Sequence, residues 1–471
     1  MNAAKAVPAR APGMWASLRE ALAGTHQDYT EGSIERAIVL LAVPMVLEMC
    51  MESLFGVVDV FWVARLGENA ITTVGLTESC LMIVFALALG LSMGATAMVA
   101  RRIGEKDQPG ARVVAVQAIA IGLVVAALTA AVGYTFASDL LRVMGGTESV
   151  VRTGAGYTRM IFGGVATVYL LFLINAVFRG AGDAATAMRA LWIANTVNIC
   201  LNPLLIFGIG PFPKLGVTGS AVGTTIGRGV GVLFALWMLM RGNGKIVVRP
   251  HEFRLNIAVM LRLWRLSIGG IFQYLVQVAS WVGLIRIIAV FGSAAVAANT
   301  LGIRIIVFAI LPSWGMSNAA ATLVGQNLGA RRPDRAETSV WRTGFYNMVF
   351  LGGVGLLFIA FAEPIIGIFT NDPAVVPLAV SCLRYLSYGY ISYAYGMVVV
   401  SALNGAGDTM TPTILNFIAF WLCQIPLAYV LAFHTGLGVK GAFVAVVVSD
   451  SLLAAMGILW FRTGRWKGVR V

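Results

Sequence analysis

The chain has 471 residues, of which 59% are hydrophobic and only 12% are charged, and its mean hydropathy is +0.84. Soluble proteins carry about 25% charged residues, so this composition excludes an ordinary soluble protein and indicates an integral membrane protein. The formal net charge of +13 would suit nucleic acid, but Lys and Arg fall mostly in alternate loops. That pattern is typical of membrane topology, so we expect a lipid bilayer and no nucleic acid as partner.

Twelve long apolar segments follow one another along the chain, and most exceed the roughly 20 residues that a spanning helix needs. They cover about residues 34–64, 70–100, 112–137, 149–178, 184–208, 216–241, 257–290, 295–325, 336–361, 374–402, 411–433 and 439–462. Their length matches helices and not the alternating strands of roughly ten residues in a membrane barrel. We therefore predict an all-α integral membrane protein with twelve transmembrane helices.

Residues 1–33 form a predicted cytoplasmic N-terminal tail, in which 14–23 is either a short interfacial helix or part of a disordered segment. Lys and Arg are concentrated in the loops after the second, sixth and eighth segments and in the tail 463–471. The opposite loops hold few. The positive-inside rule then places both termini in the cytoplasm of a bacterial-type inner membrane.

The chain repeats itself at a fixed distance. FRGAGD at 178–183 is matched by LNGAGD at 403–408, an offset of 225 residues, and GVTGSA at 216 is matched by GVKGAF at 438, an offset of 222. These matches predict two lobes of six helices, an N-lobe at 34–241 and a C-lobe at 257–462, joined by a basic cytoplasmic linker at 242–256. An even number of helices per lobe gives both the same orientation, with functional sites near mid-membrane.

Three carboxylates, those of Glu48, Glu52 and Asp59, lie in the interior of the first apolar segment. Steps of four and seven residues place them on one face of a helix. A charged side chain near the bilayer centre costs about 2.5–3.5 kcal/mol, so we expect this face to line a protein interior or a wet cavity. Asp59 is the first candidate for proton or ion coupling and Glu52 the second. In the C-lobe, Gln277 stands at the position equivalent to Glu52 and Leu284 at that equivalent to Asp59, which assigns the acid chemistry to the N-lobe.

The fifth segment places Asn195, Asn198 and Asn202 on one face, and Thr224 lies in the sixth. Amide and hydroxyl oxygens of this kind either complete a Na⁺ site with Asp59 or hold a proton on it by hydrogen bonding. The alternative is that the Asn residues only join helices together.

Five further residues are candidates for substrate binding: Glu48, Glu78, Gln277, Arg228 and Asp450. Glu48 is otherwise a relay or a structural residue, and Glu78 otherwise reaches water at the outer end of its helix. Arg228 and Asp450 occupy equivalent repeat positions, and each either contacts substrate or has a local polar partner. The many Met and aromatic residues suit a plastic cavity for lipophilic cations, and equally a lipid-facing surface.

Sequence motifs of enzymes and ATPases are missing. The two glycine-rich motifs lack the Lys-Ser/Thr of a phosphate loop and are predicted to be helix–helix turns, and neither HExxH nor GxSxG occurs. We therefore expect neither an enzyme nor a bound cofactor.

Together, Pro44 with VDVFWVARLG after it, the RGAGD and NGAGD turns, NxxxNP in the fifth helix and the two six-helix lobes carry a resemblance. Over nearly its whole length the chain resembles prokaryotic members of the multidrug and toxic compound extrusion (MATE) family. The resemblance implies a V-shaped antiporter, expected to be monomeric, that exports small organic cations in exchange for H⁺ or Na⁺ by alternating access.

The resemblance also implies an N-lobe ion-coupling site, formed here by Asp59, Asn175, Asn198, Asn202 and Thr224. A Na⁺ ion would bind at Asp59, Asn198 and Asn202, but Asn202 stands where the best-matched pattern has Asp. Losing that carboxylate weakens a Na⁺ site, and Glu52 restores the charge from the first helix.

The alternative function is a lipid-linked oligosaccharide flippase of the related superfamily. That function would need cavity arginines, for which Arg286 and Arg304 are the candidates, and often two extra helices.

Overall fold

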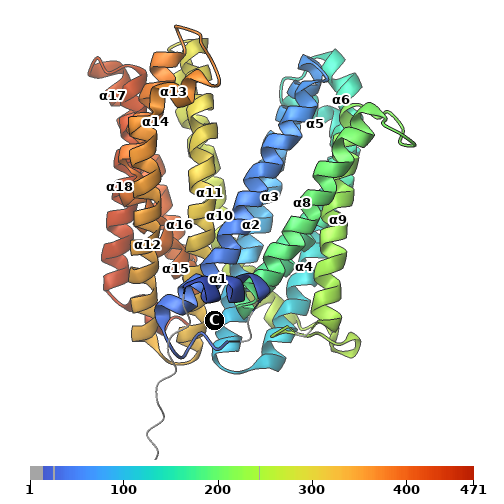
Figure 1. The fold of residues 1–471 in the computed structure, drawn as a ribbon, viewed down its shortest axis with the longest axis vertical. Helices are drawn as coiled ribbons and strands as arrows, with labels where there is room; N and C mark the ends of the chain where they lie inside the picture. Colours follow the sequence, from blue (N-terminus) through green and yellow to red (C-terminus); the bar gives the residue numbers. More distant parts are fainter. Residues whose placement is uncertain (1–13, 25–26, 243) are drawn as a thin grey trace, which may run out of the picture.

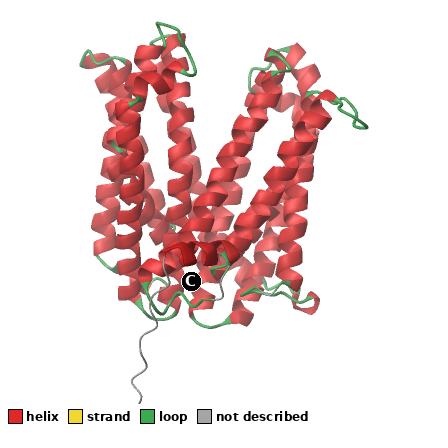
Figure 2. Ribbon diagram, in the orientation of Figure 1, coloured by secondary structure: helices red, strands yellow, loops and turns green. Residues whose placement is uncertain are grey.

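The structure is a computed structural model that describes residues 14–24, 27–242 and 244–471. Helices and their connecting loops make up these residues, and no strand occurs among them (Figure 2). Residues 1–13 and 25–26 of the predicted N-terminal tail, and residue 243 of the predicted linker, lie outside the described residues.

The first half of the chain begins with a short helix, which agrees with the interfacial-helix interpretation, and continues with long ones. The elements are α1 (Met14–Ala23), α2 (Ile34–Ala64), α3 (Glu68–Gly104), α4 (Gln108–Thr135), α5 (Ala137–Val143), α6 (Glu148–Gly163), α7 (Val165–Ala181), α8 (Ala184–Phe207), α9 (Val217–Arg241) and the 3₁₀ turn η1 (Pro250–Glu252). Ser33 caps the N-terminus of α2, where its side chain accepts a hydrogen bond from the Arg36 backbone N–H.

The second half has the same plan. Its elements are α10 (Ile257–Ala289), α11 (Ser293–Gly329), α12 (Pro333–Ala360), α13 (Ala362–Gly367), α14 (Val376–Tyr388), α15 (Tyr390–Ala406), α16 (Met410–Phe417), the π-helical turn η2 (Ile418–Gln424), α17 (Ile425–His434), α18 (Val439–Arg462) and the 3₁₀ turn η3 (Arg465–Gly468). The π-helical turn within the eleventh span has no counterpart in the sequence-based prediction.

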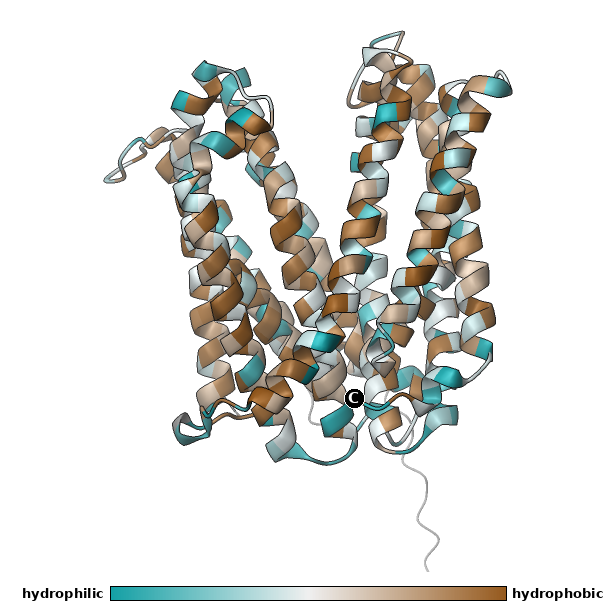
Figure 3. Cartoon of the chain, turned by 180° about the vertical axis from the view of Figure 1, so that it is seen from behind, coloured by the Kyte–Doolittle hydropathy of each residue, from teal (hydrophilic) through white to brown (hydrophobic). Residues whose placement is uncertain are grey.

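Among the described residues, eleven helical spans are long and apolar enough to cross a membrane, and α14 with α15 adds a twelfth, bent by 55°. The predicted all-α fold with two sets of six spans is confirmed. In Figure 3, hydrophobic residues dominate the middle of the helices and hydrophilic residues gather at the ends, as a bilayer requires.

The glycine-rich repeat motifs form the same helix–helix turn in each half. Helix α7 ends at Gly182 with φ +82°, and α15 ends at Gly407 with φ +91°, a left-handed conformation that glycine adopts without strain. The next residue then caps the following helix: Asp183 accepts from the Thr186 N–H, and Asp408 from the Thr411 N–H. The motifs are therefore helix-reversing turns, as predicted.

The two six-helix bundles lean apart at one end of the molecule and meet at the other (Figure 1). We call the meeting end, where α1 and the C-terminus lie, the closed end. Backbones of the two halves touch there: a Cβ added to Gly104 of α3 would lie 2.0 Å from the carbonyl oxygen of Gln326 in α11. The Gln326 side chain also donates to the Gly180 carbonyl at 2.9 Å, so this end is sealed by direct contact between the lobes.

Candidate functional site

Three acids in the interior of α2, Glu48, Glu52 and Asp59, belong to three separate polar clusters. The first is a buried ion pair. Glu48 is 2% exposed, and its Oε1 accepts hydrogen bonds from the Arg179 guanidinium at 2.8 Å and from Asn175 Nδ2 at 3.2 Å. Both partners lie on α7, so this cluster ties α2 to the helix before the RGAGD turn. The structure thus places Asn175 with Glu48 and not with Asp59.

The second cluster surrounds Glu52. Its Oε2 accepts from Asn195 Nδ2 of α8 at 3.0 Å, and its Oε1 lies 3.7 Å from the Arg228 guanidinium of α9. The Glu52 side chain is 25% exposed and reaches a cavity, whereas that of Arg228 is only 11% exposed. Arg228 therefore has the local polar partner that one of its two interpretations expected.

The third cluster holds Asp59, which is 9% exposed. Its Oδ1 accepts from Asn202 Nδ2 of α8 at 2.6 Å and from Ser220 Oγ of α9 at 2.8 Å. Among the described residues, no basic side chain lies within ion-pair distance of Asp59. It is thus the carboxylate of α2 that only neutral donors hold.

Asn198 and Thr224 lie beside these clusters, with Asn198 Nδ2 donating to Thr224 Oγ1 at 2.8 Å. The side-chain oxygens of Asn198 and Asn202 are buried and, within the described part of the chain, have no hydrogen-bond partner. Buried polar atoms normally have partners, so the free oxygen of Asn202, whose amide nitrogen donates to Asp59, and that of Asn198 one helical turn away are candidate cation ligands.

A cavity of about 250 Å³ lies between the lobes next to the first two clusters. Glu48, Glu52, Asn175 and Arg179 line it from the N-lobe, and Asn318 lines it from α11. Its two acids each have an arginine partner, so the charges around this cavity are compensated.

The C-lobe repeats this arrangement with neutral side chains. Gln273 and Asn404 occupy the positions equivalent to Glu48 and Arg179, and Asn404 Nδ2 donates to Gln273 Oε1 at 3.3 Å. Gln277 and Asp450 line a second cavity in this lobe, of about 400 Å³. Asp450 has no ion-pair partner among the described residues, unlike its repeat equivalent Arg228.

The remaining candidates lie away from both cavities. Glu78 is exposed on α3 and lines neither cavity. Arg286 and Arg304 are also exposed and, among the described residues, neither contributes to the cavity walls. The arginines on which a flippase would depend are therefore not in the cavities.

Sequence reasoning missed two residues of these clusters. Arg179 was visible as the arginine of the RGAGD turn, and a basic residue inside an apolar segment was a signal that it pairs with an acid. Ser220 gave no comparable signal, because a serine in a helix usually bonds to its own backbone.

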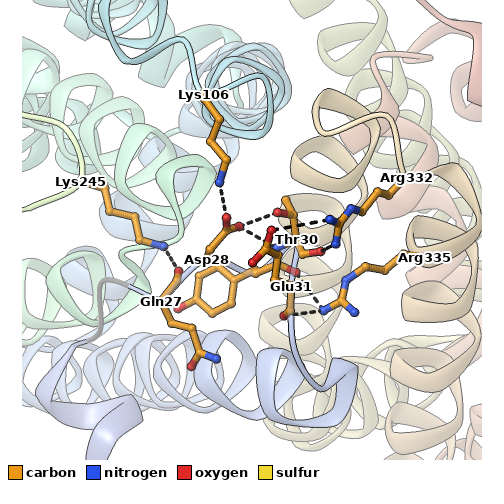
Figure 4. A network of polar contacts seen from close by, with 9 residues as sticks. Gln27, Asp28, Thr30, Glu31, Lys106, Lys245, Arg332 and Arg335 are labelled. Carbon is orange, nitrogen blue, oxygen red and sulfur yellow. Dashed lines mark hydrogen bonds and ion pairs between the residues drawn. The ribbon is translucent and has the colours of Figure 1, made fainter. Parts of the chain in front are cut away.

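A second polar feature lies at the closed end, where residues 27–35 run across both lobes (Figure 4). We call this segment the strap. Asp28 pairs with Lys106 of the N-lobe, and Lys245 of the linker donates to the Gln27 carbonyl at 2.6 Å. On the other side, Arg332 donates to the Thr30 carbonyl at 2.6 Å, and Arg335 donates to strap carbonyls including that of Gly32 at 2.9 Å.

One charged group of the strap, Asp28, and one that contacts it, Lys245, have shifted pKa values. Partial burial alone would raise the pKa of Asp28, but hydrogen bonds from Lys106 and Thr30 and the charge of Lys106 outweigh it and lower the pKa to about 2. Burial lowers the pKa of Lys245 to about 8, against the opposing influence of Asp183 and Asp28. The strap thus has a firmly ionised acid and lies against a partly buried linker lysine whose pKa is only slightly above neutral pH.

Two pseudo-repeated bundles of six spans, with buried charged groups and cavities between and within them, define a membrane transporter. The MatE family model matches residues 44–204 and 269–430, so the chain belongs to this family, the multidrug and toxic compound extrusion transporters. The second match begins 225 residues after the first, which is the offset of the sequence repeat.

Named relatives agree with this assignment. The chain is 26% identical over 446 residues to a probable multidrug resistance protein NorM of Thermotoga maritima, covering 92% of this chain and 93% of that protein. It is 22% identical to the multidrug export protein MepA of Staphylococcus aureus (93% and 96% covered) and 25% identical to an FAD transporter of Shewanella oneidensis (89% and 92% covered).

Solved structures agree as well. An outward-facing multidrug resistance MATE family transporter of the MOP superfamily superposes with a TM-score of 0.87 at 26% identity, covering 92% of this chain and 96% of that one. A MOP superfamily transporter from Pyrococcus furiosus, described as having a binding pocket of reverse polarity, gives 0.86 at 26% identity with the same coverage. The chain is therefore a multi-pass membrane protein of the MATE transporter family.

Proposed function

We propose that the protein is a secondary-active antiporter that exports lipophilic organic cations in exchange for H⁺ or Na⁺ by alternating access. It acts in a cytoplasmic membrane with both termini inside, so the closed end faces the cytoplasm and the cavities are reached from outside. The basic loops and the multidrug efflux names of the relatives support this orientation and this cargo.

One observation carries the coupling role: Asp59 is a buried carboxylate that neutral side chains hold. Taking a carboxylate out of water costs several kcal/mol unless an opposite charge repays it. Asn202 and Ser220 supply hydrogen bonds to Asp59 but no positive charge. A proton or a Na⁺ ion supplies that charge, and its arrival is therefore strongly favoured in this state.

The surroundings of Asp59 are compatible with either ion. The free side-chain oxygens of Asn198 and Asn202 offer neutral ligands that, with the carboxylate, would give a Na⁺ ion three oxygens. For a proton, the site is Asp59 Oδ2, which accepts no hydrogen bond from a described side chain, and the loss of charge would weaken the hydrogen bonds that Asn202 and Ser220 donate to Oδ1. Both events change the contacts that hold α2 against α8 and α9.

Coupling requires that this change reach the closed end. All three acids lie on α2, which begins at the strap and packs along α8 of its own lobe and α11 of the other. Repacking α2 around Asp59 would therefore act on the strap and on the seam between the lobes, both of which must open before the cavities face the cytoplasm.

The relative named as an FAD transporter raises the alternative of an anionic cargo. Such a cargo needs cationic walls, but Arg179, the one arginine among the described residues that line the cavity between the lobes, is paired with Glu48. The C-lobe cavity has an acid and, among its described lining residues, no base. Charge thus favours cations.

Transport by purified protein in proteoliposomes tests this function. An imposed proton gradient or an imposed Na⁺ gradient should drive uptake of tetraphenylphosphonium in the wild type, and Asp59→Asn should abolish the response to the coupling ion. Asp139→Asn, which removes an acid that is 61% exposed at the far end of the N-lobe, is the matched control and should transport normally. Gradient-driven transport of normal rate in Asp59→Asn would refute the role of Asp59.

A further inference from the structure

The C-lobe cavity has a net charge that the cavity between the lobes lacks. In the N-lobe, Glu48 is neutralised by Arg179 and Glu52 lies beside Arg228. The equivalent C-lobe pairs are Gln273 with Asn404 and Gln277 with Asp450. The repeat has therefore exchanged a balanced set of two acids and two bases for three amides and one acid.

Asp450 of α18 is the acid left over. It lines the cavity of about 400 Å³. The described residues that line this cavity include no Lys, Arg or His. Asp450 is partly buried, and it accepts no hydrogen bond from any described side chain. A carboxylate in such a place is stabilised when a cation enters the cavity.

The rest of the lining suits the body of an organic cation. Tyr274 and Trp314 lie with ring centroids 5.8 Å apart at an angle of 45°, and Trp281 and Tyr393 belong to the same wall. Aromatic faces attract cations and accept flat apolar groups. The volume lies within the range of about 300–1,000 Å³ that is usual for sites binding drug-sized molecules.

A polar atom also points to a ligand here. Asn404 is 3% exposed and lines both cavities, and its Oδ1 has no hydrogen-bond partner among the described residues. Six residues are shared by the linings of the two cavities, so the C-lobe cavity opens into the space between the lobes.

Resting on the proposed export function, we propose that the C-lobe cavity binds the cargo as a lipophilic monocation, with Asp450 as its counter-ion and Tyr274, Trp281 and Trp314 as its aromatic walls. The N-lobe then binds the coupling ion at Asp59, and the two lobes divide cargo and ion between them. An anionic or dicationic cargo would be left with uncompensated charge in this cavity.

Binding of tetraphenylphosphonium to the purified full-length protein tests the site, because this probe keeps a fixed single charge at every pH. Asp450→Asn should weaken binding by about tenfold or more, since it removes the one charged side chain among the described residues that line this cavity. Asp450→Glu should keep most of the affinity. Asp372→Asn, in the loop before α14, removes an exposed acid and should bind as the wild type does.

A second variant guards against loss of folding in Asp450→Asn. Gln277→Arg leaves Asp450 in place. In the N-lobe, the equivalent residues Glu52 and Arg228 lie 3.7 Å apart, so the new arginine should pair with Asp450 and neutralise its charge. It should weaken binding as strongly as Asp450→Asn does, while both variants elute as the wild type does in gel filtration.

The outcomes separate this site from the proposed function. Affinities within about twofold of the wild type in both variants would overturn the Asp450 site, even if ion-driven export were intact. A wild type that binds the probe through Asp450 but shows no gradient-driven export would uphold the site and overturn the antiport. A wild type that does not bind the probe would overturn the site directly.

Discussion

Removing the arginine of the buried pair between Glu48 and Arg179 should destabilise the protein in a way that depends on pH. The two side chains are 2% and 11% exposed and 2.8 Å apart. Breaking a buried pair by removing one partner costs about 3–5 kcal/mol. Arg179→Met should therefore lower the free energy of unfolding at pH 7 by several kcal/mol, because it leaves the Glu48 carboxylate with Asn175 as its remaining partner.

The loss has an upper limit, because an unpaired carboxyl can take a proton from solution. A carboxyl that titrates near pH 4.3 in water costs about 3.7 kcal/mol to protonate at pH 7, and about 1.4 kcal/mol less for each pH unit below that. In the variant, the folded state then binds one proton more than the unfolded state, so its stability rises as pH falls. We expect a loss of about 3–4 kcal/mol at pH 7 and about 1 kcal/mol at pH 5.

Equilibrium unfolding by SDS in mixed micelles, followed by tryptophan fluorescence at pH 7 and pH 5, measures these values. Glu48→Gln should lose the same amount of unfolding free energy at pH 5 as at pH 7, because the unpaired Arg179 guanidinium does not release its proton. The double variant should fall within about 1 kcal/mol of the wild type. Arg142→Met breaks exposed pairs and should lose less than about 0.5 kcal/mol. A loss in Arg179→Met that is equal at pH 5 and pH 7 would refute this account of the pair.

Two further predictions concern the closed end. Gly104→Ala should lower the melting temperature, because the added Cβ would lie 2.0 Å from the Gln326 carbonyl oxygen. The control Gly353→Ala adds a Cβ that meets nothing within 4 Å and should raise the melting temperature slightly. Equal shifts in the two variants would contradict the contact between the lobes. Lys245 releases its proton at about pH 8 in the folded protein and near pH 10.4 when unfolded, so the unfolded state binds more protons between these values. Between these pH values the stability of the wild type should therefore rise relative to that of Lys245→Gln. If the melting temperatures of the two proteins change with pH in the same way, the lowered pKa of Lys245 is refuted.

The interior of the helices shows how far the sequence could be followed. The face of α2 that carries Glu48, Glu52 and Asp59 was predictable, because the spacing along a helix fixes which residues share a side. The groups across from that face were not, since Arg179, Arg228 and Ser220 reach it from helices whose rotation depends on packing. Asn175 and Asp59 were expected in one site, and the structure places them in different clusters along α2.

By itself, the sequence determined the membrane class, the spans, the two lobes and the turns between helices, because hydropathy, periodicity and glycine chemistry are local properties of the chain. Only the tertiary structure decided which charges are compensated. Arg228 and Asp450 occupy equivalent repeat positions, yet Arg228 lies beside an acid, whereas Asp450 faces an aromatic cavity whose described lining residues include no base. Electrostatic partnership depends on distances of a few ångströms between helices, and these are fixed by how side chains fill the space between them.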